Sequence, residues 1–242
     1  MLSKTEIKYI QSLAQKKSRD SEDVFIMEGK KMVQEVLTEF PHQIIRLYGT
    51  ASFYKQLSLQ PVEKNMVLIT DTELEQISVL QTPNLAVAIV KKLPASIIDK
   101  NKWLIALDAI RDPGNLGTII RIADWFGISQ ILCSVDCADV YNPKTVQASM
   151  GSILRVAVIQ GNLQEVLPKC PQPVYAATLG GIAAQKISFE QTGTLLIGNE
   201  ARGVATELLK FVNTEVSIPS FGHAESLNAA IAAGILLWEI KR

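Results

Sequence analysis

The sequence predicts an α/β protein made of a small first domain and a larger second domain with a parallel sheet. Short apolar stretches alternate with stretches of helical spacing along the chain. Residues 91–102, which contain Pro94 and several charged side chains, interrupt this alternation, and a new strand pattern follows them. Alternating strands and helices favour a parallel sheet with helices on both faces. We therefore expect domains at residues 1–95 and 96–242.

The first half carries strand and helix patterns in turn, as expected for a small α/β/α unit. Ile7, Ile10 and Leu13 recur at helical spacing and predict a helix over residues 5–17. Thr70 and Asp71 are residue types that cap helices, so we expect a helix from there to residue 80. The other expected helices are 30–40 and 53–59, and the expected strands are 24–27, 44–48, 66–69 and 85–90.

The second half begins with a strand expected at residues 103–107. Gly127 ends a helix predicted over 116–126, and Asn142 with Pro143 begins a helix that ends near residue 151. An apolar helix is expected over 229–240. Further strands are expected at 130–133, 156–159, 174–178, 195–197 and 216–218, and further helices at 162–168 and 204–211.

The charge of the chain is balanced, with 24 basic and 24 acidic residues. Composition therefore does not indicate a nucleic-acid partner, although a local basic patch would suffice for one. Seven basic residues face five acidic ones within the first 31 positions, with Lys16, Lys17 and Arg19 close together. This cluster is either a surface that contacts phosphates or a solvated helix face.

The three cysteines, Cys133, Cys137 and Cys170, do not form a zinc-type pattern with the two histidines. Cys133 and Cys137 are expected to be buried thiols rather than metal ligands, so no metal site is predicted. Reduced cysteines and the lack of a signal peptide or a membrane span indicate a cytoplasmic protein without a membrane partner.

Three loops follow predicted strands and are rich in glycine and polar residues, which is where α/β sheets place ligands. Residues 112–121 lead from Asn115 to Arg121, which lies among isoleucines and is expected to be partly enclosed. An enclosed arginine needs a polar or anionic partner, and an ion pair with Asp108 or Asp124 is the simpler alternative to a ligand.

Residues 198–204 form the second loop and residues 218–228 the third. Gly198 permits close backbone contact, and Asn199 with Glu200 can bind a ligand or form a plain turn. His223 is expected to face solvent. Ser226 could be a nucleophile, but no Ser-His-acid order supports a hydrolase. The Walker A and dinucleotide glycine patterns are both missing, which argues against a nucleotide-dependent oxidoreductase or ligase.

Taken together, the three loops resemble the motifs of the SpoU family, also called TrmH, of RNA ribose 2′-O-methyltransferases. Residues 115–127 resemble its first motif, 196–204 its second and 218–236 its third, in the order of the family. Residues 1–95 resemble its L30e-like substrate-binding domain through Lys16, Lys17 and Arg19 and through residues 25–29. Residue periodicity alone predicts an ordinary doubly wound sheet, whereas the resemblance implies a C-terminal domain with a deep trefoil knot, the SPOUT fold.

The resemblance also implies a cofactor, a substrate and roles for single residues. S-adenosylmethionine would lie in the knot against Thr178, Leu179, Gly198, Ile218 and Leu227. Arg121 is the residue assigned to activate the 2′-hydroxyl, with Asn115, Glu200, Ser226 and Asn228 orienting it and the nucleotide. Lys16, Lys17 and Arg19 would contact RNA.

The resemblance further implies a homodimer that contacts RNA and not DNA. The apolar C-terminal helix and residues 125–126 would be buried between subunits. The separate first domain favours ribosomal RNA. Transfer RNA as substrate, and an RNA-binding protein of the same fold without methyl transfer, are the alternatives.

Overall fold

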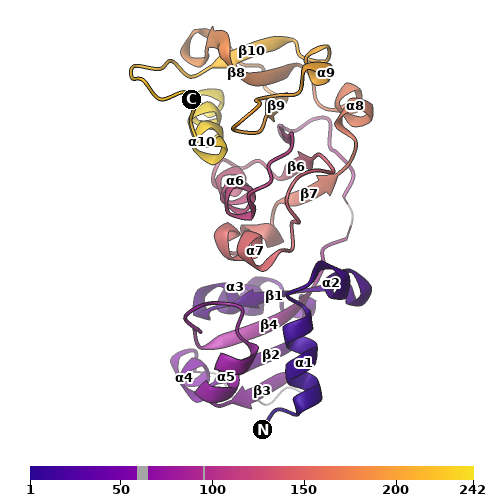
Figure 1. Ribbon diagram of the computed structural model, residues 1–242, viewed down its shortest axis with the longest axis vertical. Helices are drawn as coiled ribbons and strands as arrows, with labels where there is room; N and C mark the ends of the chain where they lie inside the picture. Colours follow the sequence, from indigo (N-terminus) through magenta and orange to yellow (C-terminus); the bar gives the residue numbers. More distant parts are fainter. Residues whose placement is uncertain (59–64, 95) are drawn as a thin grey trace. The chain divides into compact units, whose positions relative to one another are not determined.

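A computed structural model of the chain describes residues 1–58, 65–94 and 96–242 (Figure 1). These residues form two compact units. The first contains Met1–Pro94 and Tyr141–Leu154. The second contains residues 96–140 and Arg155–Arg242. Residue 95, where the first expected domain ends, and residue 59, where an expected helix ends, lie outside the described residues. No helix of the described ranges has the length and apolarity that crossing a bilayer requires.

The first unit is built on a four-stranded sheet with the strand order β1-β4-β2-β3. Strand β4 is antiparallel to both of its neighbours, and β2 is parallel to β3. The strands are β1 (Val24–Glu28), β2 (Ile44–Thr50), β3 (Met66–Ile69) and β4 (Ala86–Lys91). The helices are α1 (Lys4–Ser12), α2 (Lys16–Glu22), α3 (Lys30–Glu39), α4 (Ala51–Gln56) and α5 (Asp71–Ile77), with a 3₁₀ turn at Pro41–Gln43.

The helix expected over residues 5–17 is in fact two helices, and Arg19 explains the break. Gln15 has an extended backbone between α1 and α2. The Arg19 guanidinium donates hydrogen bonds of 2.7 Å to the carbonyls of Leu13 and Ala14. Its side chain is 2% exposed. The expectation that Arg19 belongs to an exposed basic cluster is therefore wrong, because Arg19 satisfies carbonyls that the end of α1 leaves without helical partners.

Residues 141–154 pack with the first unit, although the pattern of the chain placed them in the second domain. They contain helix α7 (Pro143–Ser149) and a 3₁₀ turn at Ser152–Leu154. The Tyr141 ring lies 4.8 Å from the ring of Phe25, and the Tyr141 hydroxyl accepts a hydrogen bond of 3.2 Å from the Leu93 amide. A single boundary near residue 95 did not anticipate this segment.

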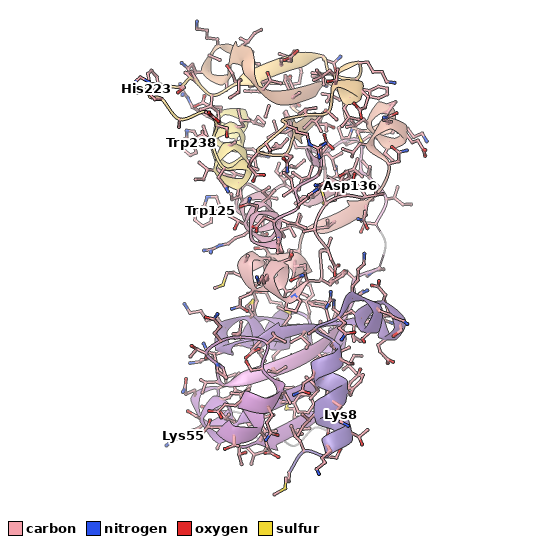
Figure 2. All side chains as sticks on the ribbon, in the orientation of Figure 1. Lys8, Lys55, Trp125, Asp136, His223 and Trp238 are labelled. Atoms are coloured by element: carbon pink, nitrogen blue, oxygen red, sulfur yellow. The ribbon has the colours of Figure 1, made fainter. Side chains whose placement is uncertain are left out.

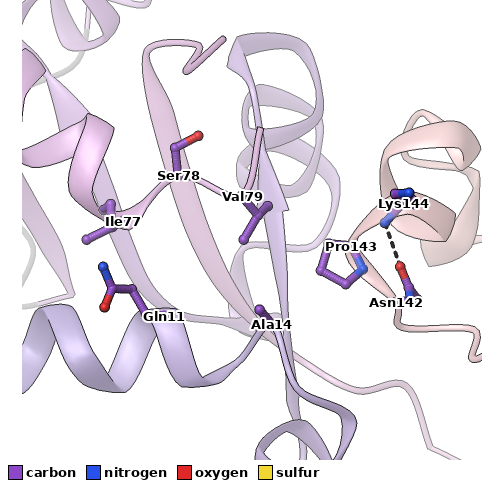
Figure 3. Close-up of a pocket in the computed structure, with 8 residues that line it drawn as sticks. All are labelled: Gln11, Ala14, Ile77, Ser78, Val79, Asn142, Pro143 and Lys144. Carbon is purple, nitrogen blue, oxygen red and sulfur yellow. Dashed lines mark hydrogen bonds between the residues drawn. The ribbon is translucent and has the colours of Figure 1, made fainter. Parts of the chain in front are cut away.

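An open groove of about 410 Å³ lies beside α7 in the first unit (Figure 3). None of the residues from the three predicted loops lines it. The groove therefore does not correspond to the predicted ligand site. Its lining residues are Gln11, Ala14, Ile77, Ser78, Val79, Asn142, Pro143 and Lys144.

The second unit contains a six-stranded sheet with the order β10-β8-β9-β5-β6-β7, and every neighbouring pair is parallel. The predicted parallel α/β domain is thereby confirmed. The strands are β5 (Leu104–Leu107), β6 (Gln130–Cys133), β7 (Ala157–Gln160), β8 (Val174–Ala183), β9 (Thr194–Ile197) and β10 (Thr214–Ser217). The helices are α6 (Pro113–Trp125), α8 (Leu163–Val166), α9 (Thr206–Leu209) and α10 (Ala229–Lys241), with 3₁₀ turns at Leu167–Lys169 and Ala184–Lys186.

Two features of this sheet position the loops. Helix α10 packs against α6 (Figure 1). Strand β8 pairs with β10 up to Ala176 and again from Ile182, while β10 advances by only one residue, from Glu215 to Val216. Residues 177–181 therefore bulge out of the ladder. A side chain at Gly181 would collide with the backbone of Glu215, so this crossing needs a glycine.

Candidate active site

The three predicted loops leave the carboxyl ends of strands in the second unit. Residues 108–112 follow β5, residues 198–204 follow β9 and residues 218–228 follow β10. Helix α6 begins at Pro113, three residues before the predicted start, because Asp112 caps it by accepting a hydrogen bond of 2.8 Å from the Asn115 amide. Asn115 thus lies in the first turn of α6.

One network of side-chain hydrogen bonds joins the three loops. The Asn115 amide nitrogen donates to a Glu200 carboxylate oxygen at 2.6 Å, and the Asn228 amide nitrogen donates to the Asn115 side-chain oxygen at 2.9 Å. The Asn228 oxygen caps α10 by accepting from the amides of Ala230 and Ile231 at 2.9 and 3.3 Å. Three of the five predicted catalytic residues therefore meet: Asn115 from the first turn of α6, Glu200 from the loop after β9 and Asn228 from the residue that caps α10.

A second set of bonds ties the loop after β5 to the loop after β9. The Asn199 side chain donates to the Ala109 carbonyl at 3.0 Å, and an Asp108 carboxylate oxygen accepts from the Ala205 amide at 2.9 Å. Ala109 has a positive φ of 54°, a conformation that is uncommon without glycine. The structure thus uses Asn199, which is expected from the sequence to bind a ligand or form a plain turn, and Asp108, which is expected as an alternative partner of Arg121, to connect two loops.

Arg121 does not join this network, and its side chain is exposed. Six residues of helix rotate the chain by about 240°, so Arg121 faces away from the Asn115 side of α6. Among the described residues it forms no ion pair: Asp124 binds Arg155 at 2.7 Å, and Asp108 accepts from a backbone amide. The expectations of a partly enclosed Arg121 and of its ion pair with Asp108 or Asp124 are both wrong for the single chain.

Arg121 instead shares an outward surface with apolar side chains. Trp125, one helical turn further along α6, is 84% exposed, and Trp238 of α10 is 59% exposed. Both tryptophans project from the left-hand side of the second unit in Figure 2. Ile231 and Ile235 of α10 are also exposed and fall on one helical stripe with Trp238. We call Arg121, Trp125, Ile231, Ile235 and Trp238 the α6–α10 face.

The loop before α10 is exposed along most of its length, and Ser226 and His223 both face solvent. His223 is therefore placed as expected. From Ile218 to Leu227, no backbone amide donates to another backbone group in the described ranges of the chain. These amide groups remain available to a ligand or a partner.

The predicted cofactor residues fit a polar ligand at these strand ends. Thr178 and Leu179 lie in the bulge of β8, and the Thr178 hydroxyl oxygen is buried with no hydrogen-bond partner in the described residues. Buried hydroxyls rarely lack a partner, so a ligand is the natural acceptor or donor. A side chain at Gly198 would collide with the backbone of Gly203. Within the described ranges, no cluster of metal-ligating side chains is found.

S-adenosylmethionine carries an ammonium group, a carboxylate, ribose hydroxyls and an adenine base. These groups can use the unpaired Thr178 hydroxyl and the free amides between Ile218 and Leu227. The exposed Leu179, with 81% of its surface accessible, offers an apolar contact beside them. The residues present therefore fit the cofactor that the sequence implied.

Comparison with known proteins gives a family match for each part of the chain. Residues 102–238 match the SpoU rRNA Methylase family, and residues 4–88 match the MRM3-like substrate binding domain. The chain is 28% identical over 240 residues to the 23S rRNA (guanosine(2553)-2'-O)-methyltransferase RlmP of Bacillus subtilis, which covers 98% of this chain and 96% of that protein.

Two solved structures show the same architecture over nearly the whole chain. A TrmH-family protein from Porphyromonas gingivalis superposes with a TM-score of 0.88 at 34% identity, covering 100% of this chain and 98% of that one. An AdoMet-bound rRNA methyltransferase from Sinorhizobium meliloti superposes with a TM-score of 0.86 at 31% identity, covering 99% and 96%. The SPOUT fold is thereby confirmed, and the trefoil knot, which that fold implies, stays a prediction.

These matches confirm the expected enzyme class, an RNA ribose 2′-O-methyltransferase that uses S-adenosylmethionine. They rest on more than half of the chain, and they include all three loops that meet in the hydrogen-bond network. The chain belongs to the SpoU rRNA methylase family.

Proposed function

We propose that this enzyme methylates a ribose 2′-hydroxyl of ribosomal RNA, at a site built around Asn115, Glu200 and Asn228. The network that joins these three residues carries the proposal, because it fixes all three loops at one end of the sheet. Two supports favour ribosomal RNA. The relatives RlmP and the Sinorhizobium meliloti enzyme are both named for it, and residues 4–88 match a substrate-binding domain.

In this proposal residues 1–95 form the substrate-binding domain and residues 96–242 the methyltransferase domain. Lys16 and Lys17 of α2 are exposed and remain candidates for phosphate contacts, whereas the buried Arg19 does not.

S-adenosylmethionine supplies an electrophilic methyl group on a sulfonium, and the chain's residues must place the 2′-hydroxyl in line with it. Thr178, Leu179, Gly198, Ile218 and Leu227 hold the cofactor through the hydroxyl, the free amides and the apolar contacts described above. Asn115, Glu200 and Asn228 fix the loops and orient the nucleotide. Ser226, which is exposed and outside the network, would act only once RNA binds.

Arg121 is best suited to stabilise negative charge. An arginine guanidinium keeps its proton in proteins, so it is a poor base for the 2′-hydroxyl. It can instead stabilise the developing alkoxide or hold a phosphate while the proton leaves to water or to the RNA. Removing a comparable group that stabilises an oxyanion costs about 2.7–4 kcal/mol in other enzymes.

The position of Arg121 suggests that it works in a second copy of the chain. Within one subunit it lies on the α6–α10 face, turned away from Asn115. Trp125 and Trp238 on the same face are too large and too exposed to be favourable in an isolated subunit. We infer a homodimer in which the α6–α10 faces of two subunits pack together and each subunit brings Arg121 to its partner's site.

Complementation between two inactive variants tests this arrangement. Arg121→Ala and Asn115→Ala subunits are co-expressed with different tags, and the heterodimer is purified through both tags. If Arg121 acts across the interface, one of the two sites is complete, and the heterodimer keeps about half of the wild-type activity. An inactive heterodimer shows that Arg121 acts in its own subunit, and an active monomer in sedimentation overturns the dimer.

The RNA target is tested separately by mapping 2′-O-methyl groups. Ribosomal and transfer RNA from cells that lack the protein are compared with RNA from wild-type cells. Loss of a methyl group from ribosomal RNA supports the proposal, and purified protein should restore it in vitro. Loss from transfer RNA alone overturns the ribosomal target, and unchanged RNA overturns methyl transfer in the cell.

A further inference from the structure

Two thiols, Cys133 and Cys137, lie next to residues 107–110, which lead from β5 toward α6. Cys133 is the last residue of β6 and is buried, and Cys137 follows after a short turn and is 9% exposed. Both cysteines lie beside Leu107, because Cys133 is paired with Leu107 in the parallel ladder of β5 and β6 and the Cys137 thiol donates to the Leu107 carbonyl at 3.3 Å. The Cys137 sulfur also lies 3.5 Å from the Ser134 hydroxyl. Val135 and Asp136 between them are exposed, and Figure 2 shows Asp136 in this turn.

This turn is bonded to the loop after β5 at four points. The Leu107 carbonyl accepts from the Ser134 amide at 2.9 Å and from the Cys137 thiol at 3.3 Å. The Ala109 amide donates to the Ser134 hydroxyl at 2.9 Å. The Ala138 amide donates to the Ile110 carbonyl at 2.8 Å. The conformation of residues 107–110 therefore depends directly on the turn that holds both cysteines.

The same loop connects to the proposed active site. The carbonyl of Ala109, whose φ is positive, accepts a hydrogen bond from the Asn199 side chain. Asp112, at the end of the same loop, caps α6 by accepting a hydrogen bond from the Asn115 amide. A movement of the turn would thus be transmitted through Ala109 to the loop after β9, and through Asp112 to the start of α6.

We propose that Cys133 and Cys137 form a dithiol modification site that hydrogen peroxide oxidises to a disulfide, and that the disulfide impairs methyl transfer by distorting residues 107–112. The Cys137 sulfur attacks one peroxide oxygen, which forms an S–O bond, breaks the O–O bond and releases water. The Cys133 sulfur then attacks the Cys137 sulfur, forming the S–S bond and releasing a second water. Two thiols lose two electrons and two protons, and the peroxide is reduced to two waters.

The surroundings make Cys137 the attacking thiol. The neighbouring Cys133 thiol lowers the pKa of Cys137 to about 7, although burial opposes this shift. The same contact and complete burial raise the pKa of Cys133. The Leu107 carbonyl, which accepts from the Cys137 thiol, favours the protonated form, but Cys137 remains the more acidic and more exposed of the two.

Disulfide formation removes the thiol proton that Cys137 shares with the Leu107 carbonyl. It also draws the Cys133 and Cys137 side chains together across the turn. This movement should change the geometry of the hydrogen bonds that Ser134 forms with Leu107 and Ala109. Cys170 provides an internal control. It is buried elsewhere in the second unit, its thiol donates to the Val166 carbonyl, and burial raises its pKa to about 11.

The test combines mass spectrometry with activity, because only the activity consequence rests on the proposed function. The purified protein is treated with hydrogen peroxide, and its peptides are mapped without reduction. We expect a peptide that contains Cys133 and Cys137 to lose the mass of two hydrogen atoms, while Cys170 stays reduced. Methyl transfer should fall by about tenfold or more and recover with dithiothreitol.

Variants separate the site from general oxidation. Cys137→Ser keeps a donor for the Leu107 carbonyl, and it should stay active after peroxide treatment; Cys133→Ala should behave likewise. Cys170→Ser should remain as sensitive as the wild type. The proposal is overturned if the pair stays reduced while Cys170 or methionines oxidise, or if the disulfide forms with activity unchanged. If the reduced protein methylates no RNA, the proposed function fails, whereas the peptide map still decides whether the dithiol site exists.

Discussion

The Asn115–Glu200–Asn228 network and the α6–α10 face both involve α6 and α10, the network at the starts of these helices and the face along their outer sides. Only the network is complete within a single chain. In the network, side-chain donors meet side-chain acceptors at 2.6 and 2.9 Å. On the α6–α10 face, a charged group without an ion pair in the described residues stands beside two exposed tryptophans. A single chain therefore joins the loops of the site, whereas its α6–α10 face stays exposed.

Replacing Arg121 tests the α6–α10 face and should have the largest effect on methyl-transfer activity. Arg121→Ala should lower methyl transfer by about a hundredfold to a thousandfold, because in the proposed mechanism it removes a charge that stabilises the transition state. It should leave S-adenosylmethionine affinity and thermal stability unchanged, since Arg121 is exposed. Methyl transfer to RNA, calorimetric cofactor titration and a thermal melt measure the three quantities.

Thr118→Ala, one turn earlier on α6 and also exposed, is the matched control and should stay active. Unchanged turnover in Arg121→Ala would remove Arg121 from the mechanism. A large fall in its melting temperature would instead indicate a structural role.

Replacing Asn115 by aspartate tests the Asn115–Glu200–Asn228 network. The new carboxylate would face Glu200 at a position where the present contact measures 2.6 Å, and two like charges at this distance repel. Asn115→Asp should therefore lower both activity, by about a hundredfold, and thermal stability. Asn115→Ala removes the contact without adding charge and should be less destabilising. Equal melting temperatures for the aspartate variant and the wild type would mean that the network does not hold the loops.

Charge reversal on α2 tests whether RNA binding is separate from both regions. Lys16→Glu with Lys17→Glu should weaken RNA binding by about tenfold at low salt and reduce the dependence of affinity on salt, because phosphate contacts release counterions. Subunit association should not change. Lys55→Glu, an exposed lysine on α4, is the control (Figure 2). Equal affinity and salt dependence in the double variant and the control would exclude the cluster as the RNA surface.

The sequence predicts the Asn115–Glu200–Asn228 network better than it predicts the α6–α10 face. Loops that follow parallel strands lie at the same end of the sheet, so the loops that carry Asn115, Glu200 and Asn228 are expected to lie near one another, whereas the choice of these residues comes from the family resemblance. The isoleucines beside Arg121, at positions 119, 120 and 122, predict its burial, whereas the helix turns position 121 outward. In the proposed homodimer the α6–α10 face is covered by a second subunit, and the residue pattern of such a face does not differ from that of ordinary core.

Two other misjudged features depend on contacts that residue patterns do not reveal. Arg19 looked like a surface cation, but its guanidinium reaches back across the chain to the end of α1. The helix within residues 141–154 is predicted by the sequence, but its packing on the first unit depends on tertiary contacts that the local sequence does not show. The bulge of β8 had a signal in the pair Gly180 and Gly181, since strands rarely contain adjacent glycines without a bulge or close contact.

Thr178 refines the comparison, because its hydroxyl is the one buried side-chain oxygen without a partner in the described part of the second unit. Thr178→Val replaces this hydroxyl by a methyl group of similar size. Without ligand the variant should be slightly more stable than the wild type, since no buried polar atom is left unpaired. With S-adenosylmethionine it should bind about two- to tenfold more weakly, because one hydrogen bond is lost. Thermal melts with and without cofactor measure both effects. Opposite signs locate the cofactor at the bulge of β8, whereas a variant that melts lower in both conditions and binds the cofactor normally would assign Thr178 to packing alone.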